Sequence, residues 1–157
     1  MKKMLVLSLF LMLYACNYSF AEEFVIKIND VRAKAGETIT VNIEISNSKP
    51  VVAFQMDIPL PLGFQYVPNS ITLNQDRGKG HIVQANVLPD SNVLRIISFS
   101  MSNANYTGSD GVIASFTLKT PKATANFPLK VENAIVADVS ATNLLTGTVD
   151  GTVRLGD

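Results

Sequence analysis

Side chains that could take part in catalysis are few in this chain and lie far apart in the sequence. His81 is the only histidine among 157 residues, so a hydrolase built on a serine, histidine and acid triad would have to use it. The sequence has no Gly-x-Ser-x-Gly motif of the kind that places a nucleophilic serine on a sharp turn. His81 is therefore interpreted as a polar residue at the start of a strand, with a contact on a binding face as the alternative.

The acidic side chains give no clear site either. The carboxylates considered for a glycosidase pair fall on separate predicted strands and loops, and they are Glu37, Glu44, Asp57, Asp90 and Glu132. A calcium loop needs several oxygen ligands at fixed spacing, and Ser109-Asp110 is not part of an Asp-x-Asp-x-Asp-Gly pattern. We predict no catalytic residues, no metal site and no cofactor.

Direct binding of sugar would depend on two tyrosines. Flat sugar platforms are usually built from aromatic rings, and the chain has no tryptophan. Beyond residue 21 only Tyr66 and Tyr106 remain besides six phenylalanines, most of which fit core positions. If the protein binds carbohydrate directly, these two tyrosine rings are expected to lie coplanar and exposed.

The elements that would position these residues are strands, and the clearest spans 112–118. Ser109-Asp110 lies between Gly108 and Gly111, and Asp-Gly is a strong turn signal. From Val112 onward apolar residues alternate, which is typical of a half-buried strand near the middle of a sheet. We expect Phe116 to lie in the core, together with Ile43 from an equally regular strand. Gly111 is expected to have a positive φ.

The remaining strands follow at short intervals, and no segment favours a helix. They are predicted over residues 24–28, 38–45, 51–58, 64–67, 71–73, 81–88, 93–101, 127–131 with 134–136, and 148–155. About nine strands without helices must pack sheet on sheet, so the fold class is an all-β sandwich, immunoglobulin-like in overall architecture. Residues 74–80 are polar and contain glycine, and we expect them to form a mobile loop.

One strand, 93–101, has an ambiguous pattern. Ile97 and Phe99 share a side with Arg95, while Leu94 and Ile96 lie opposite them. Either the strand is apolar on both faces, or a bulge changes its register. An apolar outer face would suit a protein partner, although burial within the sandwich explains the pattern equally well.

The first residues predict export. Lys2 and Lys3 precede an apolar run, and Ser19-Phe20-Ala21 supplies small residues where signal peptides are cut. We predict a signal peptide over residues 1–21 and a single domain over 22–157, secreted or held in the cell envelope, with no membrane insertion after cleavage. The alternative is lipid anchoring at Cys16, because Leu13-Tyr14-Ala15-Cys16 resembles a lipoprotein cleavage motif.

Charge excludes one class of partner. Without Lys2 and Lys3 the chain has 11 basic and 13 acidic residues, which is a net charge of −2. A protein that binds nucleic acid or an anionic membrane needs a basic surface. We therefore expect no nucleic-acid partner.

Four segments together resemble the cohesin domain family. They are the Ala-Gly-Glu-Thr turn and strand at 35–41, the strand at 53–58, the Gly-Ser-Asp-Gly-Val-Ile-Ala segment at 108–114, and the Asp-Gly-Thr-Val pattern at 148–153. The resemblance covers nearly all of residues 22–157 and implies a nine-stranded jelly-roll sandwich related to carbohydrate-binding modules. The proline-rich segment 59–63 departs from it, because typical cohesins have a Tyr-Asp-Pro run there.

The resemblance implies a non-catalytic binding module rather than an enzyme. Cohesins bind a small calcium-loaded helical partner, the dockerin, and so assemble polysaccharide-degrading enzymes. The face that they use includes the third, fifth and sixth strands, which correspond here to 51–58, 81–88 and 93–101.

Six polar residues on these strands are predicted to bind the partner, namely Gln55, Asp57, Gln84, Asn86, Arg95 and Ser98. Arg95 and Asp57 are expected to supply charge-assisted contacts that orient docking. The expected partner is a dockerin-like or other cell-surface protein involved in polysaccharide use. Alternatives are a carbohydrate-binding module that contacts polysaccharide directly and a structural domain of an envelope assembly.

Overall fold

The computed structural model describes residues 21–157, which form thirteen strands and no helix. The predicted signal peptide, apart from its last residue, and Cys16 lie outside the described residues. The strands are β1 (Phe24–Ile28), β2 (Val31–Lys34), β3 (Thr38–Asn47), β4 (Ala53–Pro59), β5 (Gln65–Tyr66), β6 (Thr72–Leu73), β7 (Ile82–Val87), β8 (Val93–Phe99), β9 (Val112–Lys119), β10 (Asn126–Leu129), β11 (Glu132–Ala137), β12 (Gly147–Val149) and β13 (Gly151–Gly156).

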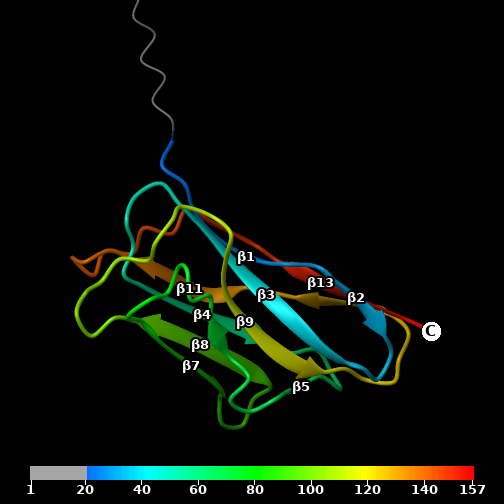
Figure 1. Ribbon diagram of the computed structural model, residues 1–157. Coiled ribbons are helices and arrows are strands. Elements are labelled where there is room, and N and C mark those ends of the chain that lie inside the picture. Colours follow the sequence, from blue (N-terminus) through cyan, green and yellow to red (C-terminus); the bar gives the residue numbers. More distant parts are fainter. Residues whose placement is uncertain (1–20) are drawn as a thin grey trace, which may run out of the picture.

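Two main sheets pack face to face and confirm the predicted β-sandwich. One has the order β12-β1-β3-β9-β5, with β6 also paired to β9, and the other has the order β11-β4-β8-β7. A smaller sheet, β10-β13-β2, completes the fold. Figure 1 shows the two layers, with β3 and β9 in one and β4, β8 and β7 in the other.

The strand count exceeds the predicted nine for two reasons. Two predicted strands divide, because β10 and β11 join different sheets, and so do β12 and β13. The short strand β2 was not predicted, since its sequence Val-Arg-Ala-Lys is half polar and its parallel partner β13 comes more than 110 residues later.

The core lies between the two main sheets, and the predicted core residues occupy it. Phe116 on β9 and Ile43 on β3 are fully buried, which confirms both predictions. Phe54 and Met56 on β4 and Ile96 on β8 meet them from the opposite sheet in one continuous apolar cluster. The sandwich therefore buries its apolar faces as the alternating patterns require.

The start of β9 differs from simple alternation. Ile43 pairs with Ala114 and Glu44 pairs with Val112, so Ile113 is an extra residue in a β-bulge. The bulge turns Ile113 into the core, where it is fully buried, although strict alternation places it on the other face. Gly111, immediately before the strand, has a φ of 86° and confirms the predicted left-handed turn.

The loop 74–80, which the sequence predicted to be mobile, is connected to the first sheet through Arg77. Arg77 is buried, and its guanidinium donates to the carbonyl oxygens of Thr107, Ile45 and Gly111 and to Oδ1 of Asn47, at 2.7–2.9 Å. These bonds connect the loop to the end of β3 and to the turn before β9. A single side chain thus joins three segments that are distant in sequence.

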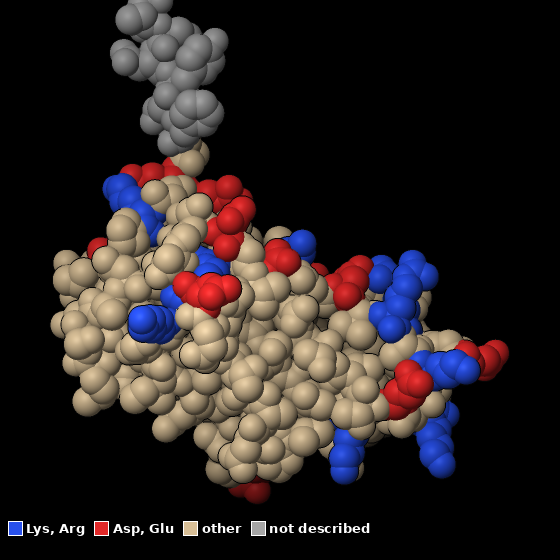
Figure 2. Space-filling model, in the orientation of Figure 1, with Lys and Arg blue, Asp and Glu red and all other residues tan. Residues whose placement is uncertain are grey.

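Charged side chains are sparse over part of the surface that Figure 2 shows. In the view of Figure 2 they gather toward the upper edge and the right-hand end, and the broad surface between these regions is almost uncharged. Within residues 21–157 no helix has the length and hydropathy needed to cross a membrane.

Candidate partner-binding face

The β11-β4-β8-β7 sheet has one face on the core and one free face. On β4 the side chains of Phe54, Met56 and Ile58 point into the core, so alternation turns Gln55 and Asp57 outward. Directly paired residues lie on the same side of a sheet. The register then defines the outward residues, which we call the open face: Ala53, Gln55, Asp57, Pro59, Ile82, Gln84, Asn86, Val93, Arg95, Ile97, Phe99, Glu132, Ile135 and Ala137.

Five of the six predicted partner-binding residues lie together on this open face. Gln84 stands opposite Ile97, which in turn stands opposite Gln55. Asn86, Arg95 and Asp57 form the next row across the sheet. The structure therefore brings Gln55, Asp57, Gln84, Asn86 and Arg95 onto one surface, as the mapping of the strands predicted.

Ser98 does not belong to this surface, and its predicted place on it is wrong. Its side chain points into the core beside those of Leu94 and Ile96, and the residue is fully buried. The Tyr106 hydroxyl donates a 2.6 Å hydrogen bond to Ser98 Oγ. Burial raises the pKa of Tyr106 well above its usual range, so this hydroxyl keeps its proton and remains a donor.

The two predicted charges on the open face bind each other. Arg95 donates from Nε and Nη2 to the two carboxylate oxygens of Asp57, each at 2.8 Å, in a bidentate pair. Asn133 Nδ2 donates to the same carboxylate at 3.0 Å. The Asp57 side chain is almost completely buried beneath these donors. Asp57 thus holds Arg95 in place on the open face and is not itself a free charge.

A β-bulge in β11 brings Asn133 into this network. The register of β11 against β4 shifts between Glu132 and Ile135, and Asn133 has a φ of 45° within the shift. Asparagine tolerates this left-handed conformation better than most residues. The bulge therefore places an amide donor where regular pairing would not.

Acid should weaken this network. The hydrogen bond from Arg95, with a smaller effect of Asn133, lowers the pKa of Asp57, while burial opposes the shift. Because the pKa of Asp57 is lower in the folded state, the stabilisation is fully present above the unfolded value of about 4 and is lost as pH falls through the folded value. We expect the free energy of unfolding to fall more between pH 5 and pH 2 in the wild type than in Asp57→Asn. Urea unfolding at several pH values measures this free energy in both proteins. An equal decrease with falling pH in the wild type and in Asp57→Asn would show that the pair does not stabilise the fold.

The other part of the open face is apolar. Ile82, Ile97 and Ile135 are 42%, 36% and 39% exposed, and Phe99 is half-buried beside them. The β4–β8 pairing is regular, so β8 is apolar on both faces and the alternative of a bulge in that strand is wrong. Sequence reasoning did not single out Ile82 and Ile135. The sequence did contain a signal for Ile82. The next residue, Val83, packs against the core, so strand alternation turns Ile82 to the open face.

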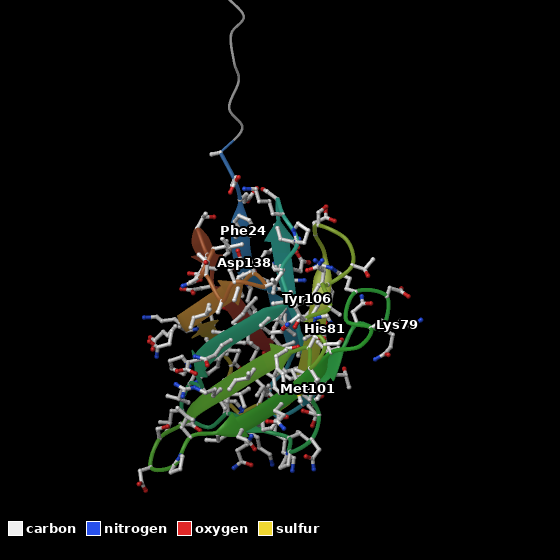
Figure 3. The ribbon with its side chains drawn as sticks, turned by 90° about the vertical axis from the view of Figure 1, so that its left-hand side faces the viewer. Phe24, Lys79, His81, Met101, Tyr106 and Asp138 are labelled. Atoms are coloured by element: carbon white, nitrogen blue, oxygen red, sulfur yellow. The ribbon has the colours of Figure 1, made fainter. Side chains whose placement is uncertain are left out.

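His81 lies just before β7, at the start of the strand as predicted, and packs against Tyr106. The two rings are stacked with centroids 3.7 Å apart and planes 20° apart. Figure 3 shows them side by side, with Lys79 farther out on the neighbouring loop. Both ring nitrogens of His81 are buried without a hydrogen-bond partner among the described residues. Among residues 21–157 no serine or carboxylate hydrogen-bonds to this histidine.

The aromatic platform required for direct sugar binding is not formed. Tyr106 is only 3% exposed, since its ring lies in the core against Phe54 and His81. Tyr66 is half-buried, and its hydroxyl accepts from the backbone of Ile71. The two rings therefore do not form a flat exposed surface.

In the described part of the chain no group of three or more His, Cys, Asp or Glu residues could hold a metal ion.

We compared the chain with known protein families and with solved structures. The model of the family described as the cohesin domain matches residues 24–155, almost the entire described chain. The chain belongs to the cohesin domain family. Cohesin domains are non-catalytic binding modules. No curated protein matches the chain.

Solved cohesins share the same sandwich. The solution structure of CaCohA2 from Clostridium acetobutylicum is 25% identical, with a TM-score of 0.70 and coverage of 85% of this chain and 91% of that one. A non-cellulosomal cohesin from the archaeon Archaeoglobus fulgidus is 16% identical, with a TM-score of 0.70 and coverage of 86% and 92%.

A third similar structure is a complex. The Coh-OlpA–Doc918 structure from Clostridium thermocellum, described as a type I cohesin–dockerin complex, matches with 18% identity and a TM-score of 0.72. The alignment covers 85% of this cohesin and 99% of that chain.

Proposed function

We propose that this cohesin binds a dockerin-like helical module through its open face and has no catalytic activity. The observation that carries the proposal is the distribution of exposed apolar side chains. Of the large exposed hydrophobic residues on described strands, Ile82, Ile97 and Ile135 lie on the open face, whereas Val87 lies on the other side of the same sheet and Val149 belongs to β12. Exposed apolar patches of this kind mark binding sites in soluble proteins.

The family supports the choice of partner. Dockerins are the partners in complexes such as that of Coh-OlpA with Doc918. The open face lies on the strands that correspond to the binding face of cohesins, and no other described element covers it. Binding to a dockerin would attach this domain to a larger assembly, and we propose that the assembly acts in polysaccharide use.

Export is part of the same proposal. The basic start, apolar run and small residues before Glu22 support secretion, with lipid anchoring at Cys16 as the alternative route to the cell envelope. A dockerin-bearing partner at the cell surface would be accessible to either form.

A charge placed in the centre of the open face should disrupt binding. Ile97→Asp is expected to weaken dockerin binding by at least tenfold, about 1.4 kcal/mol, because the carboxylate loses water when the partner covers it. Val149→Asp is the matched control, since Val149 is a similarly exposed strand residue in the other sheet. Isothermal titration calorimetry with a calcium-loaded dockerin measures the difference. Equal losses in both variants would show that the site lies elsewhere.

A further inference from the structure

The open face is divided into an apolar end and a polar end. Ile82, Phe99, Ala53 and Ala137 form one row across the sheet, next to the row that contains Ile97 and Ile135. The paired Arg95 and Asp57 lie in the row on the other side of Ile97. A partner that covers this face therefore meets mostly apolar side chains at one end and mostly uncharged polar side chains toward the other.

The apolar end continues beyond the strands. β8 and β11 are both antiparallel to β4, so they end at the same edge of the sheet. Met101 follows β8 and is 81% exposed, and Val139 follows β11 and is 65% exposed. Two large exposed aliphatic side chains thus lie in the loops that leave this edge of the sheet.

Free charge is nearly absent from the open face. The Asp57 carboxylate accepts three hydrogen bonds and is buried, and Arg95 uses Nε and Nη2 to hold it. Glu132 is the other charged residue, and it stands exposed at the margin of the face where water screens it. The face therefore has no unpaired central charge that a charged partner could neutralise.

Arg95 retains one group for a partner. Its side chain is 37% exposed, and Nη1 has no hydrogen bond within residues 21–157. A carboxylate that approached Nη1 would also approach Asp57, and the two negative charges would repel each other. A neutral oxygen, such as a hydroxyl or a backbone carbonyl, could accept from Nη1 without this repulsion.

We propose that the dockerin-like partner presents an aliphatic, uncharged helical surface to the open face, with a neutral oxygen acceptor opposite Arg95. This inference rests on the proposed function and states the chemistry of the partner. Charge pairs make association sensitive to salt, whereas apolar contacts are little affected. Binding should therefore change by less than about twofold between low and high salt.

The test uses a display library of defined chemistry. The probe is the Doc918 dockerin with its exposed helix positions randomised equally among aliphatic, neutral polar and charged residues. Selection on the wild-type cohesin is combined with counterselection on Ile97→Asp and, as a second variant, Ile82→Asp. Both variants keep Leu62, Met101 and Val139 exposed, so clones that bind apolar residues indiscriminately are removed. Circular dichroism confirms that each variant is folded.

We expect the enriched clones to carry aliphatic residues and a neutral acceptor, and their affinity to vary less than about twofold between 50 and 500 mM NaCl. Replacing Arg95 with methionine should weaken clones that carry the acceptor more than clones that lack it. Enrichment of charged clones whose affinity falls tenfold with salt would overturn this inference while leaving dockerin binding intact. If no clone prefers the wild type over the two variants, the proposed function itself fails, and this inference with it.

Discussion

Phe116→Ala is expected to lower the free energy of unfolding by about 3–5 kcal/mol. The ring lies in the centre of the apolar cluster between the two sheets and is fully buried. Its removal takes away buried apolar surface and leaves a cavity that neighbouring residues, held by regular strand pairing, can fill only in part. Urea unfolding followed by circular dichroism measures the change.

Phe116→Leu is the matched control, because leucine keeps most of the apolar volume. We expect it to lose less than half as much stability as the alanine variant. An unchanged unfolding midpoint for Phe116→Ala would contradict the position of this ring and the register between β3 and β9.

Arg77→Met should be nearly as damaging, although Arg77 is a loop residue. The change removes the donor from the buried Ile45 carbonyl oxygen and Asn47 Oδ1, and from two partly buried carbonyl oxygens, those of Thr107 and Gly111. A buried acceptor without a partner costs about 1–3 kcal/mol, so we expect a total loss of about 3–5 kcal/mol after partial rearrangement. Burial lowers the pKa of Arg77, and the nearby charge of Asp110 opposes this effect. Equilibrium unfolding in urea gives the loss.

Arg77→Lys separates charge from geometry. Lysine keeps the positive charge but has one nitrogen, which cannot reach all four acceptors on two separate segments. It should therefore recover only a minor part of the lost stability. Full recovery by lysine, or no loss in methionine, would show that the hydrogen bonds of the guanidinium do not hold the loop.

Local patterns predicted much of the fold. Phe116 and Ile43 were placed in the core by alternation, and Gly111 was assigned its positive φ from the Asp-Gly turn alone. The features that sequence reasoning missed depend on distant partners. The loop around Arg77 is fixed by acceptors 30 to 34 residues away, and β2 pairs with a strand near the other end of the chain.

The candidate site was predicted in its location but not in its chemistry. Mapping of the strands put Gln55, Gln84 and Asn86 on the same surface, as the register shows. Ser98 was misplaced, although its phase in β8 matches that of Leu94 and Ile96, because a polar residue was assumed to point outward. Its hydrogen-bond partner Tyr106 lies outside any strand, so alternation could not reveal it.

The pairing of Arg95 with Asp57 was likewise not apparent from the sequence. The two residues are 38 positions apart and become direct neighbours only through the β4–β8 register. The third donor, Asn133, depends on a bulge that disturbs regular alternation. The charged pair connects β4 to β8 and leaves only Nη1 of Arg95 for a partner.

The most direct test of the account is to map where a bound dockerin contacts this cohesin. The isotope-labelled domain, residues 22–157, is titrated with a calcium-loaded dockerin while its backbone amide signals are followed by nuclear magnetic resonance. We predict that the largest shifts occur in β4, β7, β8 and β11, with Ile97 and Gln84 among the most affected. Shifts confined to β1, β3, β9 and β12 would contradict the assignment of the open face as the binding site.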